Sequence, residues 1–145
     1  MLDARCLQEV VSLHAFFERW FRGELQGEAA LARVDRALAE DFTMVSPRGL
    51  RDDKESMLSV LRRAQGCRTR TFRITIEGME VLTVSPPLCI LTYEEHQQEA
   101  GKGTARITTA AFRETSSNPA GVEWVRVHET WAAPDQPAAV PGEGG

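Results

Sequence analysis

Residues 69–82 read TRTFRITIEGMEVL and contain the clearest alternation in the chain. Phe72, Ile74 and Ile76 fall on one side of an extended backbone, while the residues between them are polar or charged. Successive side chains of a strand point to opposite faces of its sheet, so this pattern predicts a half-buried strand. A sheet that buries one face needs a second layer to cover it.

The chain after this strand is predicted to be extended as well. Pro86-Pro87 marks a connection, and Gly101-Lys102-Gly103 has the glycines that a tight hairpin turn requires. Further strands are predicted at residues 88–98, 104–115 and 122–133. The first of these begins apolar on both faces, which is typical of a strand at the centre of a sheet or at a subunit interface.

Helical periodicity dominates the chain before residue 69. Apolar residues recur every three or four positions over 3–22 and over 28–40, and Asp52 or Asp53 can cap a third helix. A short strand is predicted at 42–46. The fold class is therefore α+β, with N-terminal helices packed on a strongly curved antiparallel sheet that leaves a pocket at its open end.

Length and composition favour one domain. The 145 residues are 42% hydrophobic and carry a formal net charge of −4, so they can bury a core but are poorly suited to non-specific nucleic-acid binding. Residues 1–133 are predicted to form that domain, and 134–145 a disordered tail. No run of about 18 apolar residues is present, which predicts no membrane span.

The cysteines indicate a reducing compartment. Cys6, Cys67 and Cys89 are odd in number and lack the spacing of a disulfide framework or a metal site. The N-terminal residues also lack the pattern of a signal peptide. These observations predict a cytoplasmic protein, and no metal or cofactor is expected.

Four segments carry a resemblance to a known superfamily. They are LAEDFTMVSPRG at 38–49, ILTY at 90–93, RITTAAFR at 106–113 and WVRVHET at 124–130. In order and spacing they resemble the nuclear transport factor 2-like superfamily, which implies a cone-shaped, cystatin-like fold. Within it, SnoaL-like proteins and the association domain of calcium/calmodulin-dependent kinase are most similar. Thr130 replaces a histidine that often closes the last motif, and Ala110 replaces a pocket-facing arginine of the kinase domain.

Three residues are candidates for catalysis. Tyr93 and Glu95 lie two apart on one strand face, where a partly desolvated carboxyl group can act as a general acid or base. This interpretation fails if Glu94 faces the pocket instead. The favoured alternative is a packed tyrosine at a strand end with a solvated glutamate beside it. His128, predicted to share a face with Trp124, is the third candidate, and a buried structural histidine is its alternative.

The same interior is predicted to bind a ligand. Arg106, Thr108 and Phe112 share a strand face, where a cation beside a small and an aromatic side chain can hold a carboxylate. The candidate ligand-binding residues are Phe17, Trp20, Met44, Tyr93, Arg106, Thr108, Phe112 and His128. Aromatic residues at helical spacing are more often core, and His14 is expected to be a core histidine.

Three functions remain open from the sequence. The first is a SnoaL-like pocket domain that binds a small apolar or carboxylated molecule and forms a homodimer through its sheet. The second is a cofactor-independent isomerase, dehydratase or cyclase, with Glu95 or His128 moving a proton and Tyr93 or Arg106 stabilising an oxyanion. The third is a protein-interaction or dimerisation module. The first is preferred because the spacing reveals no compelling acid–base pair.

Overall fold

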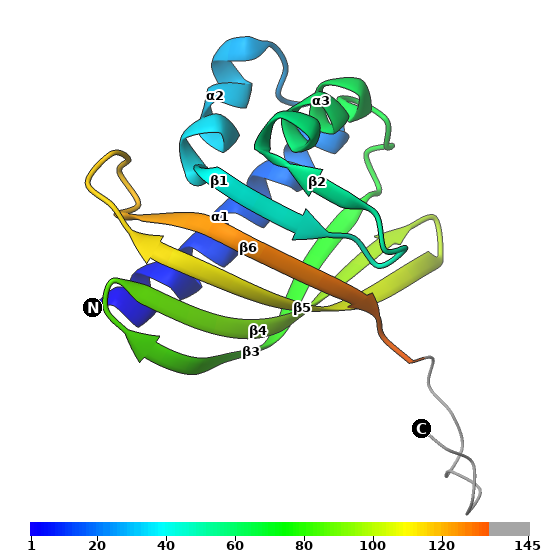
Figure 1. Ribbon diagram of the computed structural model, residues 1–145. Helices are drawn as coiled ribbons and strands as arrows, with labels where there is room; N and C mark the ends of the chain where they lie inside the picture. The colour runs from blue at the N-terminus through cyan, green and yellow to red at the C-terminus, as the bar shows by residue number, and fades with distance from the viewer. Residues whose placement is uncertain (134–145) are drawn as a thin grey trace, which may run out of the picture.

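A long helix lies behind one curved sheet, and two shorter helices lie beside the edge of that sheet (Figure 1). The computed structural model describes residues 1–133, and the predicted tail at 134–145 lies outside the described residues. The helices are α1 (Leu2–Phe21), α2 (Glu28–Ala37) and α3 (Lys54–Ala64). The strands are β1 (Leu38–Val45), β2 (Arg51–Asp53), β3 (Arg73–Ser85), β4 (Leu88–Glu99), β5 (Lys102–Glu114) and β6 (Val122–Trp131). The predicted α+β class is confirmed.

The sheet is mixed rather than wholly antiparallel, which corrects one part of the predicted fold. Its strand order is β2-β1-β6-β5-β4-β3, and the β1–β6 pair is parallel. A parallel pair needs a long connection between its strands, and here β2, α3 and the β3–β5 meander supply it. β4 lies between β3 and β5, so it is an interior strand of the sheet.

The core forms where α1 crosses the concave face of the sheet. Cys6, Val10 and Leu13 of α1 are at most 2% exposed, and they belong to one buried cluster with Phe112 of β5 and Trp124 of β6. The rings of these two aromatic residues lie 4.4 Å apart between centroids. Burial of each such apolar side chain stabilises the fold by about 1.5–3 kcal/mol.

Several element boundaries differ from the predictions: the strand predicted at 42–46 begins at Leu38, and the short strand β2 was not predicted. The helix predicted at 28–40 ends at Ala37, because Leu38–Val45 pairs with β6 and β2 as a strand. The strand predicted at 69–82 begins at Arg73 and runs to Ser85, as its pairing with β4 requires. Asp53, one of the two predicted caps, accepts a hydrogen bond from the Ser56 amide at 2.8 Å and starts α3.

Within residues 1–133, no helix is both long and apolar enough to cross a membrane.

Candidate functional site

The inner face of the sheet encloses a pocket of about 140 Å³ at the end of α1 that carries Phe17 and Phe21. Strand β4 changes character along this face: Cys89 and Leu91 belong to the core, and Tyr93, Glu95 and Gln97 line the pocket. The pocket therefore combines aromatic side chains with a small group of polar ones, the usual composition of a ligand site.

His14 and Glu95 form a buried pair at the base of the pocket. His14 Nε2 lies 3.1 Å from Glu95 Oε1, and His14 Nδ1 lies 2.7 Å from the Val10 carbonyl oxygen. Both ring nitrogens thus face acceptors, and an imidazole can donate to both only when it carries two protons. Burial alone lowers the pKa of His14, but the Glu95 carboxylate more than offsets that effect and raises the pKa above its ordinary value.

Glu95 is an ionised carboxylate despite being only 6% exposed. Burial raises its pKa, but His14, a hydrogen bond from Gln97 and the nearby Arg106 together lower it to about 2. The Gln97 side-chain amide donates to Glu95 Oε2 over 2.6 Å. Glu95, not Glu94, faces the pocket, so the register condition on the predicted site is met.

A second carboxylate, Glu129, lies across the same pocket. Arg106 Nη1 and the Thr108 hydroxyl each donate to it over 3.3 Å. Burial, followed by the like charge of Glu95, raises the pKa of Glu129 above its ordinary value. The Arg106 guanidinium also lies 5.0 Å from the ring centroid of Trp131, while its buried Nε has no hydrogen-bond partner among the described residues.

Tyr93 forms one wall of the pocket beside His14, with ring centroids 5.4 Å apart in an edge-to-face arrangement. Burial raises the pKa of its phenol well above the usual value, and the neighbouring carboxylates raise it further. The phenol therefore remains protonated at neutral pH and is available as a hydrogen-bond donor.

The structure gathers some of the predicted site residues and separates others. Phe17, Met44, Tyr93, Glu95 and Arg106 line the pocket. Trp20, Thr108 and Phe112 are buried in the packed interior and are not among the lining residues. Trp20 is held there by its indole N–H, which donates to the Leu61 carbonyl oxygen over 2.8 Å and ties α1 to α3.

The predicted position of His128 is wrong, because a β-bulge intervenes in β6. Ala111 pairs with Arg126 but Phe112 pairs with Trp124, which leaves Val125 as an extra residue on β6. The side chains after the bulge therefore change face. His128 is exposed on the outer face, while Glu129 is 8% exposed and points inward.

Three polar lining residues were not among the sequence candidates: His14, Gln97 and Glu129. Gln97 was accessible to the same reasoning, since it continues the two-residue spacing of Tyr93 and Glu95. His14 is buried as expected, but its partner is 81 residues away in sequence. Among residues 1–133, no group of three or more His, Cys, Asp or Glu side chains is placed to hold a metal ion.

The fold and its pocket define a protein of the nuclear transport factor 2-like superfamily, as the sequence resemblance predicted. A crystal structure of such a protein from Pseudomonas aeruginosa superposes with a TM-score of 0.81 at 26% identity, covering 89% of this chain and 99% of that one. The hub of a calcium/calmodulin-dependent kinase II from S. rosetta gives a TM-score of 0.66 at 14% identity, covering 87% of this chain and 94% of the hub. The second likeness concerns the fold alone.

A match to a family model classifies the chain more narrowly than the superfamily does. The model for the family Sucrose-6-phosphate phosphohydrolase C-terminal matches residues 6–133, and the chain belongs to that family. A probable sucrose-phosphatase 2 of Arabidopsis thaliana is 27% identical over 126 residues, which cover 86% of this chain. The matched region spans only 29% of that relative's length.

These matches overturn the preferred functional prediction. The preferred prediction was a SnoaL-like pocket domain for an apolar or carboxylated ligand, with an isomerase or an interaction module as alternatives. The matching family and relatives are instead named for sucrose phosphatases. The error arose because the superfamily motifs specify the fold, and one fold carries many unrelated functions.

Proposed function

We propose that this chain is the sugar-recognising accessory domain of a sucrose-phosphatase-type enzyme. In this proposal a separate phosphohydrolase catalytic unit cleaves the phosphate ester, and the pocket of this domain binds a sugar ring of the substrate or product. Family membership supports the enzyme class. The observation that carries the proposal is the polar group around Glu95 inside a pocket otherwise walled by aromatic and aliphatic side chains.

The polar groups of the pocket match a ligand rich in hydroxyl groups. Each hydroxyl both donates and accepts a hydrogen bond. Glu95 and Glu129 offer acceptor oxygens, Gln97 offers both a donor and an acceptor, and the Tyr93 phenol offers a donor. Phe17 and Phe21, whose rings stack with centroids 6.0 Å apart, can cover the apolar face of a sugar ring.

The charges disfavour the two ligand classes that the sequence predicted. A carboxylated ligand would meet the ionised Glu95, and the one guanidinium in the pocket, that of Arg106, is already engaged by Glu129. An apolar ligand would remove water from these groups without replacing its hydrogen bonds. Each polar group left without a partner would make the binding free energy less favourable by about 1–3 kcal/mol. A neutral, hydrogen-bonding ligand avoids both penalties.

The size of the pocket fits one ring. An apolar cavity of about 150 Å³ in another protein admits benzene, so about 140 Å³ has room for the ring atoms of one sugar, with the ring's substituents extending toward the mouth of the pocket. In this proposal the second ring of sucrose projects from the mouth of the pocket toward the catalytic unit.

A binding experiment tests the proposal. Sucrose and glucose, titrated into the ¹⁵N-labelled full chain, should shift the side-chain amide resonances of Gln97, and benzoate should not. Gln97→Ala should weaken sugar binding about tenfold by removing a hydrogen bond to a charged network. Gln98→Ala, one position along β4 and exposed, is the matched control and should leave affinity unchanged. Benzoate binding more tightly than either sugar would overturn the proposal.

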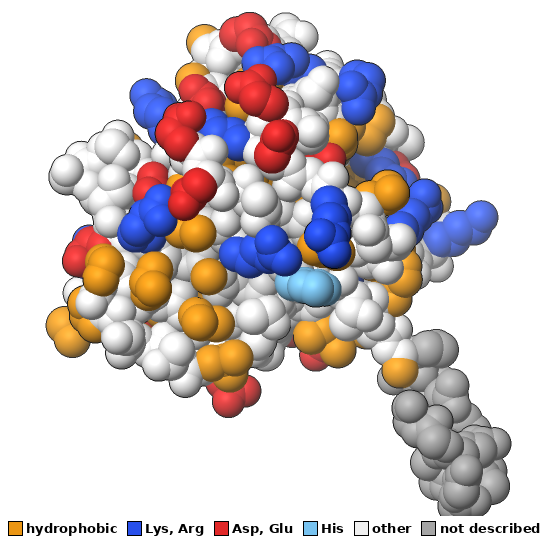
Figure 2. Space-filling view, viewed as in Figure 1, with side chains coloured by type: hydrophobic (Ala, Val, Ile, Leu, Met, Phe, Trp, Pro, Cys, Tyr) orange, Lys and Arg blue, Asp and Glu red, His pale blue; other side chains and the backbone are white. Residues whose placement is uncertain are grey.

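We also propose that the chain forms a homodimer through the outer face of β4 and β5. Ile107 is 43% exposed and Leu88 45%, and Ile90 lies on the same face. Figure 2 shows hydrophobic side chains gathered on this side of the molecule, next to a band of basic residues. A second copy would cover this apolar surface by an isologous contact. In sedimentation experiments the unmodified chain should be a dimer and the double variant Ile90→Lys/Ile107→Lys a monomer. A monomeric unmodified chain would refute this arrangement.

A cytoplasmic location is the remaining part of the proposal. Cys6 and Cys89 are both fully buried and free. Burial, followed by the neighbouring Cys89, raises the pKa of Cys6 to about 12. Two adjacent protonated thiols are consistent with a compartment that keeps cysteines reduced.

A further inference from the structure

A larger hollow, of about 440 Å³, lies outside the sheet interior, between α1, α2 and the β5–β6 loop. Its lining is basic and polar, and includes Arg5, Gln8, Ser12, Arg33, Arg36 and Asn118. We refer to this hollow as the arginine groove. It shares no lining residue with the pocket that contains Glu95, which we refer to as the sugar pocket after its proposed ligand.

Arg33 is held in the arginine groove by a buried carboxylate. Its two terminal nitrogens donate to the two oxygens of Glu9 over 3.1 and 2.8 Å, and one of them also donates to the Ser12 hydroxyl over 3.3 Å. Glu9 is 2% exposed and also accepts a 3.0 Å hydrogen bond from the Trp124 indole N–H. The carboxylate thus accepts three hydrogen bonds, and the guanidinium retains unused N–H groups.

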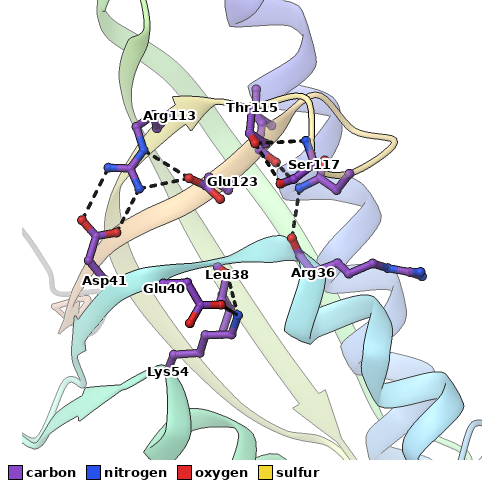
Figure 3. A network of polar contacts seen from close by, with 11 residues as sticks. Arg36, Leu38, Glu40, Asp41, Lys54, Arg113, Thr115, Ser117 and Glu123 are labelled. Atoms are coloured by element: carbon purple, nitrogen blue, oxygen red, sulfur yellow. Dashed lines mark hydrogen bonds and ion pairs between the residues drawn. The ribbon is translucent and has the colours of Figure 1, made fainter.

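The opposite side of the groove is fixed by Asn118. Its side-chain amide donates to the Arg36 and Val122 carbonyl oxygens, each over 3.0 Å, and its own oxygen accepts from the Gly121 amide. Figure 3 shows the bond to the Arg36 carbonyl and the Arg36 side chain extending away from α2. These bonds join the loop to α2, so the groove is built before any ligand arrives.

The charges of the groove are unbalanced. Arg5 is paired with Glu114 and Arg33 with Glu9, but within residues 1–133 no carboxylate forms an ion pair with Arg36. Because two of the three lining guanidinium groups are already paired, the groove has an excess of one positive charge, which Arg36 carries. This local excess of positive charge occurs in a chain whose formal net charge is −4.

We infer that the arginine groove binds a phosphoryl dianion, either inorganic phosphate or the phosphate monoester of a small molecule. Guanidinium groups present paired N–H donors that match phosphate oxygens, and a dianion compensates more charge than a carboxylate does. Gln8 and Ser12 supply further hydrogen-bonding groups at the same wall. This inference does not depend on the proposed sugar pocket.

Titration of the full chain with inorganic phosphate tests the inference. Binding should saturate, with a Kd of about 1 mM or tighter, at constant ionic strength. The indole N–H of Trp124 should shift in ¹H–¹⁵N spectra, because its acceptor Glu9 also holds Arg33. Glucose 6-phosphate is then titrated into the Gln97→Ala variant, in which the sugar pocket contributes little: tighter binding than phosphate identifies a monoester site in the groove, and equal binding identifies a free-anion site.

Arg36→Gln is the informative variant, because its side chain supports no other contact that the structure describes. It should weaken phosphate binding at least tenfold and leave the unfolding midpoint unchanged. Arg70→Gln removes an exposed cation elsewhere and should leave binding within a factor of about two. Glucose alone and the Gln97→Ala variant report the sugar pocket separately. No saturable phosphate binding in the millimolar range, or equal weakening by both arginine variants, would overturn the inference.

Discussion

Two buried glutamates belong to different hollows of the molecule and differ in the base that each one meets. Glu9 on α1 is bonded to Arg33 at the arginine groove, and Glu95 on β4 is bonded to His14 in the sugar pocket. Arginine keeps its charge at every pH the protein meets, whereas histidine titrates near neutrality. The Glu9 pair is therefore a fixed structural element, and the Glu95 pair is sensitive to pH.

The largest expected effect comes from breaking the fixed pair. Arg33→Met leaves the Glu9 carboxylate buried with the Trp124 indole as its remaining partner, and should lower the free energy of unfolding by about 3 kcal/mol. Urea denaturation at pH 7 measures this loss. The double variant Glu9→Met/Arg33→Met should recover most of it, because it leaves no isolated charge. A loss below about 1 kcal/mol in the single variant would show that water solvates Glu9.

Removing the charge of Glu95 should lower the unfolding free energy by less than Arg33→Met does, and it should also change the pKa of His14. Glu95→Gln should lower the unfolding free energy at pH 6 by about 2 kcal/mol, because a hydrogen bond between charged groups becomes a neutral one. Without the carboxylate, burial dominates and the pKa of His14 should fall below its ordinary value. Ring-proton NMR of His14 reports that change. An unchanged His14 pKa would contradict the assigned pair.

The stability of the unmodified chain should depend on pH through the His14–Glu95 pair, with one loss of stability at alkaline pH and another at acidic pH. His14 has a raised folded pKa, so its stabilisation is complete below about pH 6.5 and is lost as pH rises through the folded pKa. Glu95 has a lowered pKa, so its contribution is present above about pH 4.5 and is lost toward about 2. Thermal unfolding between pH 3 and 9 measures the profile. In Glu95→Gln the alkaline loss that depends on His14 should disappear.

The smallest effect is expected from the rim of the sugar pocket. Gln97→Ala removes the 2.6 Å hydrogen bond to Glu95, and should lower the unfolding free energy by about 1 kcal/mol or less. The pKa of Glu95 should rise toward its ordinary value, because one of the groups that stabilise the carboxylate is gone. A carboxyl titration by NMR checks this. Gln98→Ala should change neither quantity.

Local patterns predicted much of the fold. The alternation at Phe72, Ile74 and Ile76 was correct: Phe72, just before β3, is buried, and Ile74 and Ile76 are less exposed than their neighbours on β3. Tyr93 and Glu95 lie on the face that their spacing indicated. These assignments hold because strand periodicity is a property of the backbone, independent of what the strand later pairs with. The same reasoning failed at His128, because the bulge at Val125 depends on how β6 pairs with β5.

The sequence by itself determined the type of most elements, though not of β2 or of the start of β1, together with the sheet face that α1 covers and the inward position of Glu95. These follow from side-chain periodicity along a continuous stretch. Only the tertiary structure decided that His14 meets Glu95 and that Arg33 meets Glu9. Those pairs join residues far apart in the chain, and the identity of a partner fixes whether a buried carboxylate is a stable anchor or a titrating group. Pairing across the sheet, which no local pattern encodes, also decided that Glu129 rather than His128 lines the pocket.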